Sequence, residues 1–317
     1  MFKSLTKLKV ILAIVYTFIV CILVIPSKYQ VILPGSTTHM SDQVLIENHS
    51  ISNISSIYVI SYEPITLFQS FILDVTQQGS VFLPSDSTEI MTLSEKYDAA
   101  QIQKQSSYMI STIVAYEKAR KDITYEFKGY GVTSIINEQR VIQISDVIIS
   151  INGIDLSYET DFTQFANVQT LTIQLLRDNE KMVVTHERQP SDLPLALYPM
   201  FTLIEATPNI SFPGLSSTIG GPSGGMMMTL AIYLAITKQV LEFRIVGTGT
   251  IQLDGRIGNI GGLVEKYQTV RDEMDVMFVP EDQMHLLAAY NDERIVSVSS
   301  IDDVINYLNT YEKSINE

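Results

Sequence analysis

The chain opens with an uninterrupted apolar run, Val10 to Ile25, that follows three lysines. Its 16 residues are slightly fewer than the ~17–25 that a helix needs to cross a bilayer. The lysines at its two ends, Lys9 and Lys28, can extend the effective span by reaching toward the headgroups. The pattern predicts a transmembrane anchor in residues 1–28, with the basic end inside the cell and the rest outside.

A cleaved signal peptide is the alternative for this segment. Cleavage requires small residues, and the residues Leu23 to Ser27 are mostly bulky. We therefore expect the anchor to remain uncleaved.

Residues 29–121 combine short strand patterns with one long helical pattern. The runs Ile57–Tyr62 and Ser80–Leu83 are rich in β-branched and aromatic residues and predict strands. From Leu93 to Lys121 the apolar residues fall mainly on one broad helical face. We expect an extracellular region in which strands precede a helix.

Residues 122–190 predict a small β-rich domain. The segment Asp146–Gly153 is a strand that ends in an Asn-Gly turn, which favours a tight hairpin. A second strand is expected over Thr170–Leu176, and Asp178-Asn179 supplies the turn before the next strand at Met182–Val184.

Residues 191–317 alternate between strand and helix patterns, which is typical of an α/β or α+β domain. The expected elements are an apolar helix Met226–Thr237, a strand Phe243–Leu253, a helix from Gly262, a strand Val276–Val279, a helix Glu281–Ala289, a strand Ile295–Val298 and a final helix from Asp302. The fold class predicted for the whole chain is α+β (mixed α/β).

Charge and cysteine content exclude several function classes. The formal net charge of −14 argues against a nucleic-acid partner, because a polyanion repels nucleic acid. The one cysteine allows no disulfide within the chain, and the four histidines are scattered with no zinc-binding spacing. We expect no metal and no cofactor.

The first segment that can carry chemistry is Gly220–Gly225, which places Ser223 among glycines at the start of the apolar helix. Glycines let a substrate backbone approach closely, and a helix start offers free N–H groups that can stabilise an oxyanion. A serine in this place can also serve as a simple helix cap.

The second segment is Gly255–Lys266, in which Lys266 lies about one turn into a helix after a Gly-Gly pair. A lysine acts as a general base only when it is neutral, so its pKa must fall to roughly 7–8 through burial or a nearby positive field. On its own, the segment favours an exposed helical lysine.

Two other kinds of site are alternatives for the segment that contains this serine. Gly221–Gly225 matches the G-x-S-x-G pattern of α/β-hydrolases, with His285 downstream, but Ser211–Ser217 does not supply the apolar strand that this turn requires. No Lys-Ser or Lys-Thr follows the glycines, so the segment is not a Walker A phosphate loop.

Together these segments resemble the proteolytic domain of Lon-type peptidases, and most closely the membrane-anchored, PDZ-containing branch that lacks an ATPase. The matching residues are Ile219–Gly225, Gly247–Ile251 and Asp254–Lys266, in the family's order.

The resemblance implies a Ser–Lys dyad in which Ser223 is the nucleophile and Lys266 is the base. It implies that Thr248 holds the lysine amine and that Gly221, Pro222 and Gly224 shape the segment around the nucleophile. Gly224 stands where alanine is usual, and Val264 where the family often has a second lysine.

The resemblance also covers the earlier regions. The strand and turn at Asp146–Gly153 are similar to those of a PDZ domain, and Tyr130–Val132 is similar to its carboxylate-binding loop, although Ser145 replaces the usual glycine. The implied organisation is an anchor (1–28), an extracellular β-rich and helical region (29–121), a PDZ-like domain (122–190) and a Lon-like proteolytic domain (191–317).

We therefore expect a serine endopeptidase at the cell membrane, single-pass, with its catalytic domain extracellular. It would cleave peptides or unfolded segments without ATP, and homo-oligomer formation stays open. The alternative is a catalytically silent, membrane-tethered scaffold that binds peptides.

Overall fold

The computed structural model describes residues 2–47, 53–76, 79–84, 86, 90–137, 139–215, 217 and 221–315, which form a mixed α/β structure. Its α-helices are α1 (Phe2–Val24), α2 (Leu67–Thr76), α4 (Leu93–Lys118), α5 (Gly225–Thr237), α6 (Leu263–Val270) and α7 (Ile301–Ile315). Its 3₁₀ helices are η1 (Met40–Asp42), η2 (Phe162–Phe165), η3 (Pro222–Gly224) and η4 (Glu281–Tyr290). Its strands are β1 (Gln30–His39), β2 (Leu45–Ile46), β3 (Ile54–Tyr62), β4 (Ser80–Phe82), β5 (Ile123–Val132), β6 (Val147–Ile151), β7 (Ile154–Asp155), β8 (Thr170–Arg177), β9 (Glu180–Glu187), β10 (Leu197–Ala206), β11 (Ile210–Ser211), β12 (Ile245–Gly247), β13 (Thr250–Ile251), β14 (Ile257–Gly258), β15 (Val276–Pro280) and β16 (Ile295–Val298).

The first sheet has the strand order β16-β15-β12-β3-β1-β4, and its strands β12 and β15 are buried on both faces. Successive strand residues point to opposite faces, so Ile245 and Phe278 pack with α4, α5 and α7, while Val246 and Met277 pack with α6 and η4. The pairs β3–β12, β12–β15 and β15–β16 are parallel. Parallel strands covered on both faces explain the continuous apolar runs of the C-terminal region.

The second sheet has the order β10-β5-β6-β8-β9 and a separate apolar core. Its two tight hairpins turn where the sequence predicts, since Asn152, Gly153, Asp178 and Asn179 all have positive φ. The strands β6 and β8 confirm those expected over 122–190. Identity with a PDZ domain stays a prediction.

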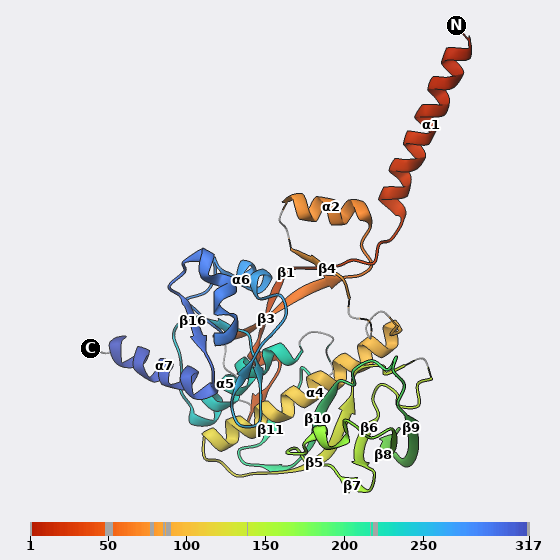
Figure 1. Ribbon diagram of the computed structural model, residues 1–317. Helices are drawn as coiled ribbons and strands as arrows, with labels where there is room; N and C mark the ends of the chain where they lie inside the picture. The colour runs from red at the N-terminus through yellow and green to blue at the C-terminus, as the bar shows by residue number, and fades with distance from the viewer. Residues whose placement is uncertain are drawn as a thin grey trace.

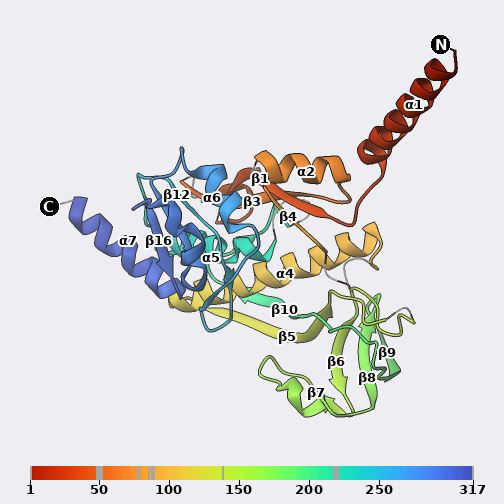
Figure 2. The same ribbon diagram turned by 45° about the horizontal axis from the view of Figure 1, so that its top comes forward.

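Helix α4 lies between the two sheets, with α5 on one side and β5 and β10 on the other (Figures 1 and 2). It begins at a capping box formed by Thr92 and Glu95. The first sheet combines strands of the regions expected over 29–121 and 191–317, and the second combines strands of 122–190 with β10 of 191–317. Strands β1 and β3 share a sheet with β12, and β10 pairs with β5. The division into domains stays a prediction.

Two C-terminal elements differ from the sequence prediction. The strand expected over Phe243–Leu253 is too long, because the chain leaves the sheet after β12 and re-forms a short strand only at β13. At the break, Gly249 N–H donates to the Ser223 carbonyl instead of to a strand. The helix expected over Glu281–Ala289 is the 3₁₀ helix η4.

The N-terminal apolar run lies in α1, which projects away from the body of the molecule (Figure 1). Among the described residues, no helix has the length and apolar character needed to span a bilayer. The predicted transmembrane helix is therefore corrected. A physical reason is the length of the uninterrupted run, since α1 ends at Val24 and only 15 of its residues are in that run.

The two-sided burial of the first sheet makes a prediction about Phe278 of β15. Its side chain is fully buried and its ring meets the Tyr307 ring edge-on, with centroids 5.4 Å apart. We expect Phe278→Ala to lower the free energy of unfolding by about 3–5 kcal/mol through lost burial and a residual cavity. Denaturant unfolding followed by circular dichroism measures this.

The matched control is Phe71→Ala on α2, where the side chain is 61% exposed. We expect that change to stay within about 0.5 kcal/mol of the parent. Equal losses in the two variants would contradict the core described here.

Candidate active site

Ser223 lies in η3, the short turn that leads directly into α5. The turn is closed by hydrogen bonds from Gly224 N–H to the Gly221 carbonyl and from Gly225 N–H to the Pro222 carbonyl. Proline suits the first position of such a turn because it has no N–H to satisfy. The serine is half-buried at the start of a helix whose other residues are almost all buried.

Thr248 connects this turn to the break between β12 and β13. Its hydroxyl donates to the Ser223 carbonyl over 3.1 Å, and Gly249 N–H donates to the same carbonyl over 2.8 Å. In return, Met226 N–H donates to the Gly249 carbonyl over 3.0 Å. The start of α5 is thus fixed against the end of β12 by three hydrogen bonds, and Thr248 is fully buried among them.

Lys266 reaches the same threonine from α6. Gly262 begins this helix in the left-handed region, at φ 66°, where a side chain would be strained. Leu263, Tyr267 and Val270 bury the helix against the first sheet and so direct the neighbouring Lys266 inward. The lysine is 2% exposed, and its Nζ donates to Thr248 Oγ1 over 3.0 Å.

Burial lowers the pKa of Lys266 from 10.5 to about 8, because the charged ammonium loses its hydration. With this pKa, roughly a tenth of the Lys266 amine is neutral at pH 7 and about half at pH 8, so the neutral form that a general base requires is populated. Within the described residues, Lys266 Nζ and Ser223 Oγ are joined through Thr248 and the Ser223 main chain, and no direct hydrogen bond links the two side-chain atoms.

Helix α4 supports the nucleophile turn from the opposite side, which the sequence analysis missed. Ser111 Oγ donates to the Gly225 carbonyl over 3.0 Å. A Cβ added at Gly225 would lie 2.9 Å from Ser107 Oγ, so only glycine permits this close approach. No local sequence signal identifies these serines, because their partners lie more than 100 residues away.

The structure brings most of the predicted site residues together. Ser223, Thr248 and Lys266 form one connected group, and Pro222 lies in the turn. Gly221 and Gly224 line a small cavity of about 20 Å³ together with Ser56 and Tyr108 of neighbouring elements. Ile219 and Gly220 of the expected motif lie outside the described residues.

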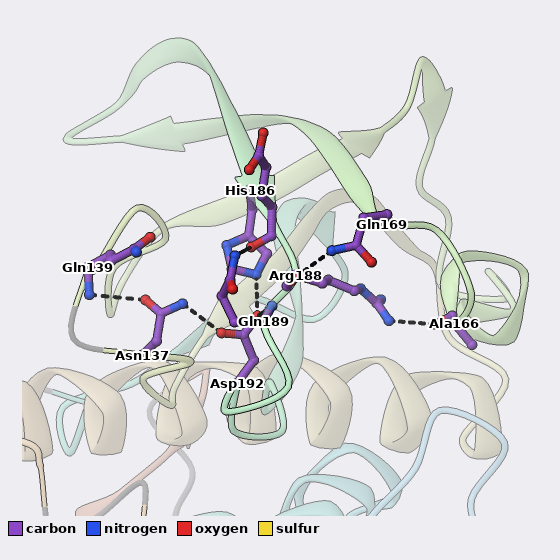
Figure 3. A network of polar contacts seen from close by, with 9 residues as sticks. Asn137, Gln139, Ala166, Gln169, His186, Arg188, Gln189 and Asp192 are labelled. Carbon is purple, nitrogen blue, oxygen red and sulfur yellow. Dashed lines mark hydrogen bonds and ion pairs between the residues drawn. The ribbon is translucent and has the colours of Figure 1, made fainter.

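A larger cavity, of about 690 Å³, lies in the second sheet and is lined mainly by apolar residues of its core. Figure 3 shows the polar network at its rim, in which Asp192 accepts from Asn137 Nδ2 over 2.7 Å and pairs with His186 Nε2 over 2.8 Å. Although burial raises the pKa of Asp192, hydrogen bonds from Gln189 N–H, Asn137 and His186 lower it below its ordinary value. The rim is therefore held by the chain's own groups.

Residues 206–310 match the family model described as the Lon protease (S16) C-terminal proteolytic domain. The matched range contains Ser223, Thr248 and Lys266. Among curated proteins, Lon protease 2 of Bacillus subtilis (strain 168) is 30% identical over 100 residues, which is 31% of this chain and 18% of that protein. Lon protease of Acinetobacter baumannii (strain AB307-0294) is 32% identical over 107 residues, which is 32% of this chain and 13% of that protein.

Lon protease of Trichlorobacter lovleyi (strain ATCC BAA-1151 / DSM 17278 / SZ) is 35% identical over 91 residues, 27% of this chain and 11% of that protein. The chain thus spans less than a fifth of the length of each of these relatives. The similarity is to their proteolytic domain.

Burial of Lys266 predicts a specific dependence of stability on pH. A lysine with a lowered pKa binds fewer protons in the folded than in the unfolded state between pH 8 and 10.5, so the free energy of unfolding rises with pH across that window. We expect the stability of Lys266→Met relative to the parent to fall by about 3 kcal/mol from pH 8 to 10.5.

Denaturant unfolding at several pH values measures this difference, and comparison of the two chains cancels the titration of all other groups. Lys238→Met is the matched control, because Lys238 is exposed at the end of α5. A stability difference between Lys266→Met and the parent that stays constant over the window would contradict a lowered pKa.

Proposed function

We propose that this chain is a serine endopeptidase that uses Ser223 as nucleophile and Lys266 as general base. The observation that carries the proposal is the chain of contacts from the buried Lys266 amine through Thr248 to Ser223. The match of residues 206–310 to the Lon proteolytic domain supports the same reaction class.

In the proposed reaction, neutral Lys266 accepts the proton of Ser223 Oγ as that oxygen attacks the scissile carbonyl carbon. A tetrahedral intermediate forms, and its C–N bond then breaks while Lys266 returns the proton to the leaving amine. Water, deprotonated by the same lysine, attacks the acyl-enzyme and releases the second product. Thr248 accepts one amine hydrogen and so holds the nitrogen lone pair in a fixed direction.

In this proposal, the main-chain N–H of Ser223 is the hydrogen-bond donor that stabilises the oxyanion. The N–H groups of Gly224, Gly225 and Met226 already donate to carbonyls of the protein, and Pro222 has none. Hydrogen-bond donors that are fixed before the reaction stabilise developing charge without reorganisation, which is the largest single contribution in many enzymes. The Gly225 N–H donates to the Pro222 carbonyl and so fixes the peptide group that carries the Ser223 N–H.

We propose that the substrates are peptides or unfolded protein segments and that cleavage needs no ATP. The sequence contains no Walker A motif, and an extended segment fits a nucleophile at a half-buried helix start. The expected location of the catalytic region outside the cell stays a prediction.

The proposal predicts that Ser223→Ala and Lys266→Ala each reduce peptide turnover at least about 10³-fold, because each removes a reacting group. A panel of quenched fluorescent peptides, assayed without ATP, measures the rates. Ser191→Ala serves as the matched serine control, because Ser191 is exposed before β10, and it should retain activity within about tenfold of the parent.

Circular dichroism confirms that each variant is folded. Unchanged turnover in either folded Ala variant would refute the dyad. A parent chain that binds peptides but cleaves none would favour the peptide-binding scaffold.

The proposal also predicts the pH profile of kcat/KM. The base works only as the neutral amine, so activity is lost as pH falls through the Lys266 pKa of about 8. We expect kcat/KM to fall about tenfold for each pH unit below 7 and to reach a plateau above 9. A rate that is constant from pH 6 to 9, or that falls toward pH 9, would contradict a lysine base.

A further inference from the structure

A second buried lysine, Lys104 of α4, lies beside the segment that leads to Ser223. Its side chain is 1% exposed. Its Nζ donates to the Gly214 carbonyl over 2.7 Å, to the Ser217 carbonyl over 2.9 Å and to Ser217 Oγ over 3.2 Å. One ammonium thus joins two main-chain carbonyls and one hydroxyl of the same four-residue segment.

Burying a lysine is costly unless its donors are satisfied. The loss of hydration lowers the pKa of Lys104 below its ordinary value. The ring of Tyr108, one turn further along α4, lies 5.6 Å from Nζ and partly replaces the lost hydration. The Tyr108 hydroxyl in turn donates to Gln43 Oε1 over 2.5 Å. The lysine is therefore built into a packed polar cluster.

The same helix holds the chain on the other side of the nucleophile. Ser111, two turns after Lys104, donates to the Gly225 carbonyl, and α4 also contacts η3. Residues 104, 107, 108 and 111 follow the spacing of one helical face. This face therefore contacts the chain both before Ser223, at Gly214 and Ser217, and after it, at Gly225.

We propose that Lys104 is a positioning residue for the reaction, which clamps Gly214 and Ser217 to α4, so that this helix holds the chain both before Ser223 and, through Ser111 and Gly225, after it. This inference rests on the proposed function for its effect on catalysis. It explains why a lysine occupies an inward position of a helix outside the matched residues 206–310.

The proximity of Lys104 to Ser217 Oγ also fits a second Ser–Lys pair with its own reactivity. The two carbonyl acceptors favour the clamp, because a base needs its lone pair directed at a hydroxyl, whereas a clamp needs N–H donors directed at carbonyls. Acylation of Ser217 by a serine-reactive probe would overturn the clamp in favour of a reacting pair.

The test replaces Lys104 by Met, which keeps most of the length of the side chain and removes its donors. We expect kcat to fall at least about tenfold with KM within about threefold, because a small displacement of a reacting group costs rate rather than binding. The matched control is Lys96→Met on the same helix, where the lysine is partly exposed and pairs with Glu63. We expect the control to keep the parent's kcat.

A second variant, Lys104→Gln, retains amide donors for the carbonyls, and we expect it to recover part of kcat. If Lys104→Met does not fold, Lys104→Gln and Ser111→Ala together carry the test, and parent-like kcat in both would overturn the proposal. Parent-like kcat in folded Lys104→Met would overturn it directly.

Hydrogen–deuterium exchange gives a readout that does not depend on activity. In Lys104→Met we expect faster exchange in peptides that cover residues 212–226 and unchanged exchange over β15 and β16. If Lys104→Met shows faster local exchange but the parent cleaves no peptide, the clamp would be supported and the proposed function refuted. If the parent cleaves peptides and Lys104→Met shows unchanged exchange and unchanged kcat, only the clamp would be refuted.

Discussion

The hydroxyl of Thr248 is the contact on which the site depends. It accepts from the buried Lys266 amine and donates to the Ser223 carbonyl, so it joins α6 to the start of α5 through one oxygen. The contact lies at the end of β12, where the Thr248 N–H still donates to the Phe278 carbonyl of β15 and the Gly249 N–H turns to the Ser223 carbonyl.

The packing of the first sheet fixes both ends of this contact. Apolar residues of β12 and β15 alternate between the α5 side and the α6 side, so the two helices are held on opposite faces of one sheet. Helix α4 adds a third support, because its serines and Lys104 contact the chain on both sides of Ser223. The N-terminal strands β1 and β3 complete the same sheet, so the region around the site is formed from segments far apart in sequence.

Local patterns predicted the individual elements well. The apolar helix α5, the strands β15 and β16 and the two hairpin turns in the second sheet each have a periodicity or turn signal of their own. The order of strands was not predictable, since nothing in Ile54–Tyr62 indicates that it pairs with Ile245–Gly247. The candidate dyad came from motif resemblance, whereas a lysine at position 266 alone fits an exposed helix.

Lys104 shows the limit of such patterns. In sequence it is one of several lysines in a polar helix, and its inward position is visible only once the partners at Gly214 and Ser217 are placed. The one available signal in the sequence is the spacing of polar residues: Lys104 stands three residues before Ser107 and seven residues before Ser111. That spacing marks a polar helical face but does not name what the face contacts.

Mass-spectrometric mapping of a fluorophosphonate probe tests the central claim most directly, because it reports which hydroxyl is activated and by what. The account predicts a single modified residue, Ser223, with a labelling rate that rises as pH increases through 8 and is lost in folded Lys266→Met. Labelling of Ser223 that is independent of both pH and Lys266, or labelling confined to another serine, would contradict it.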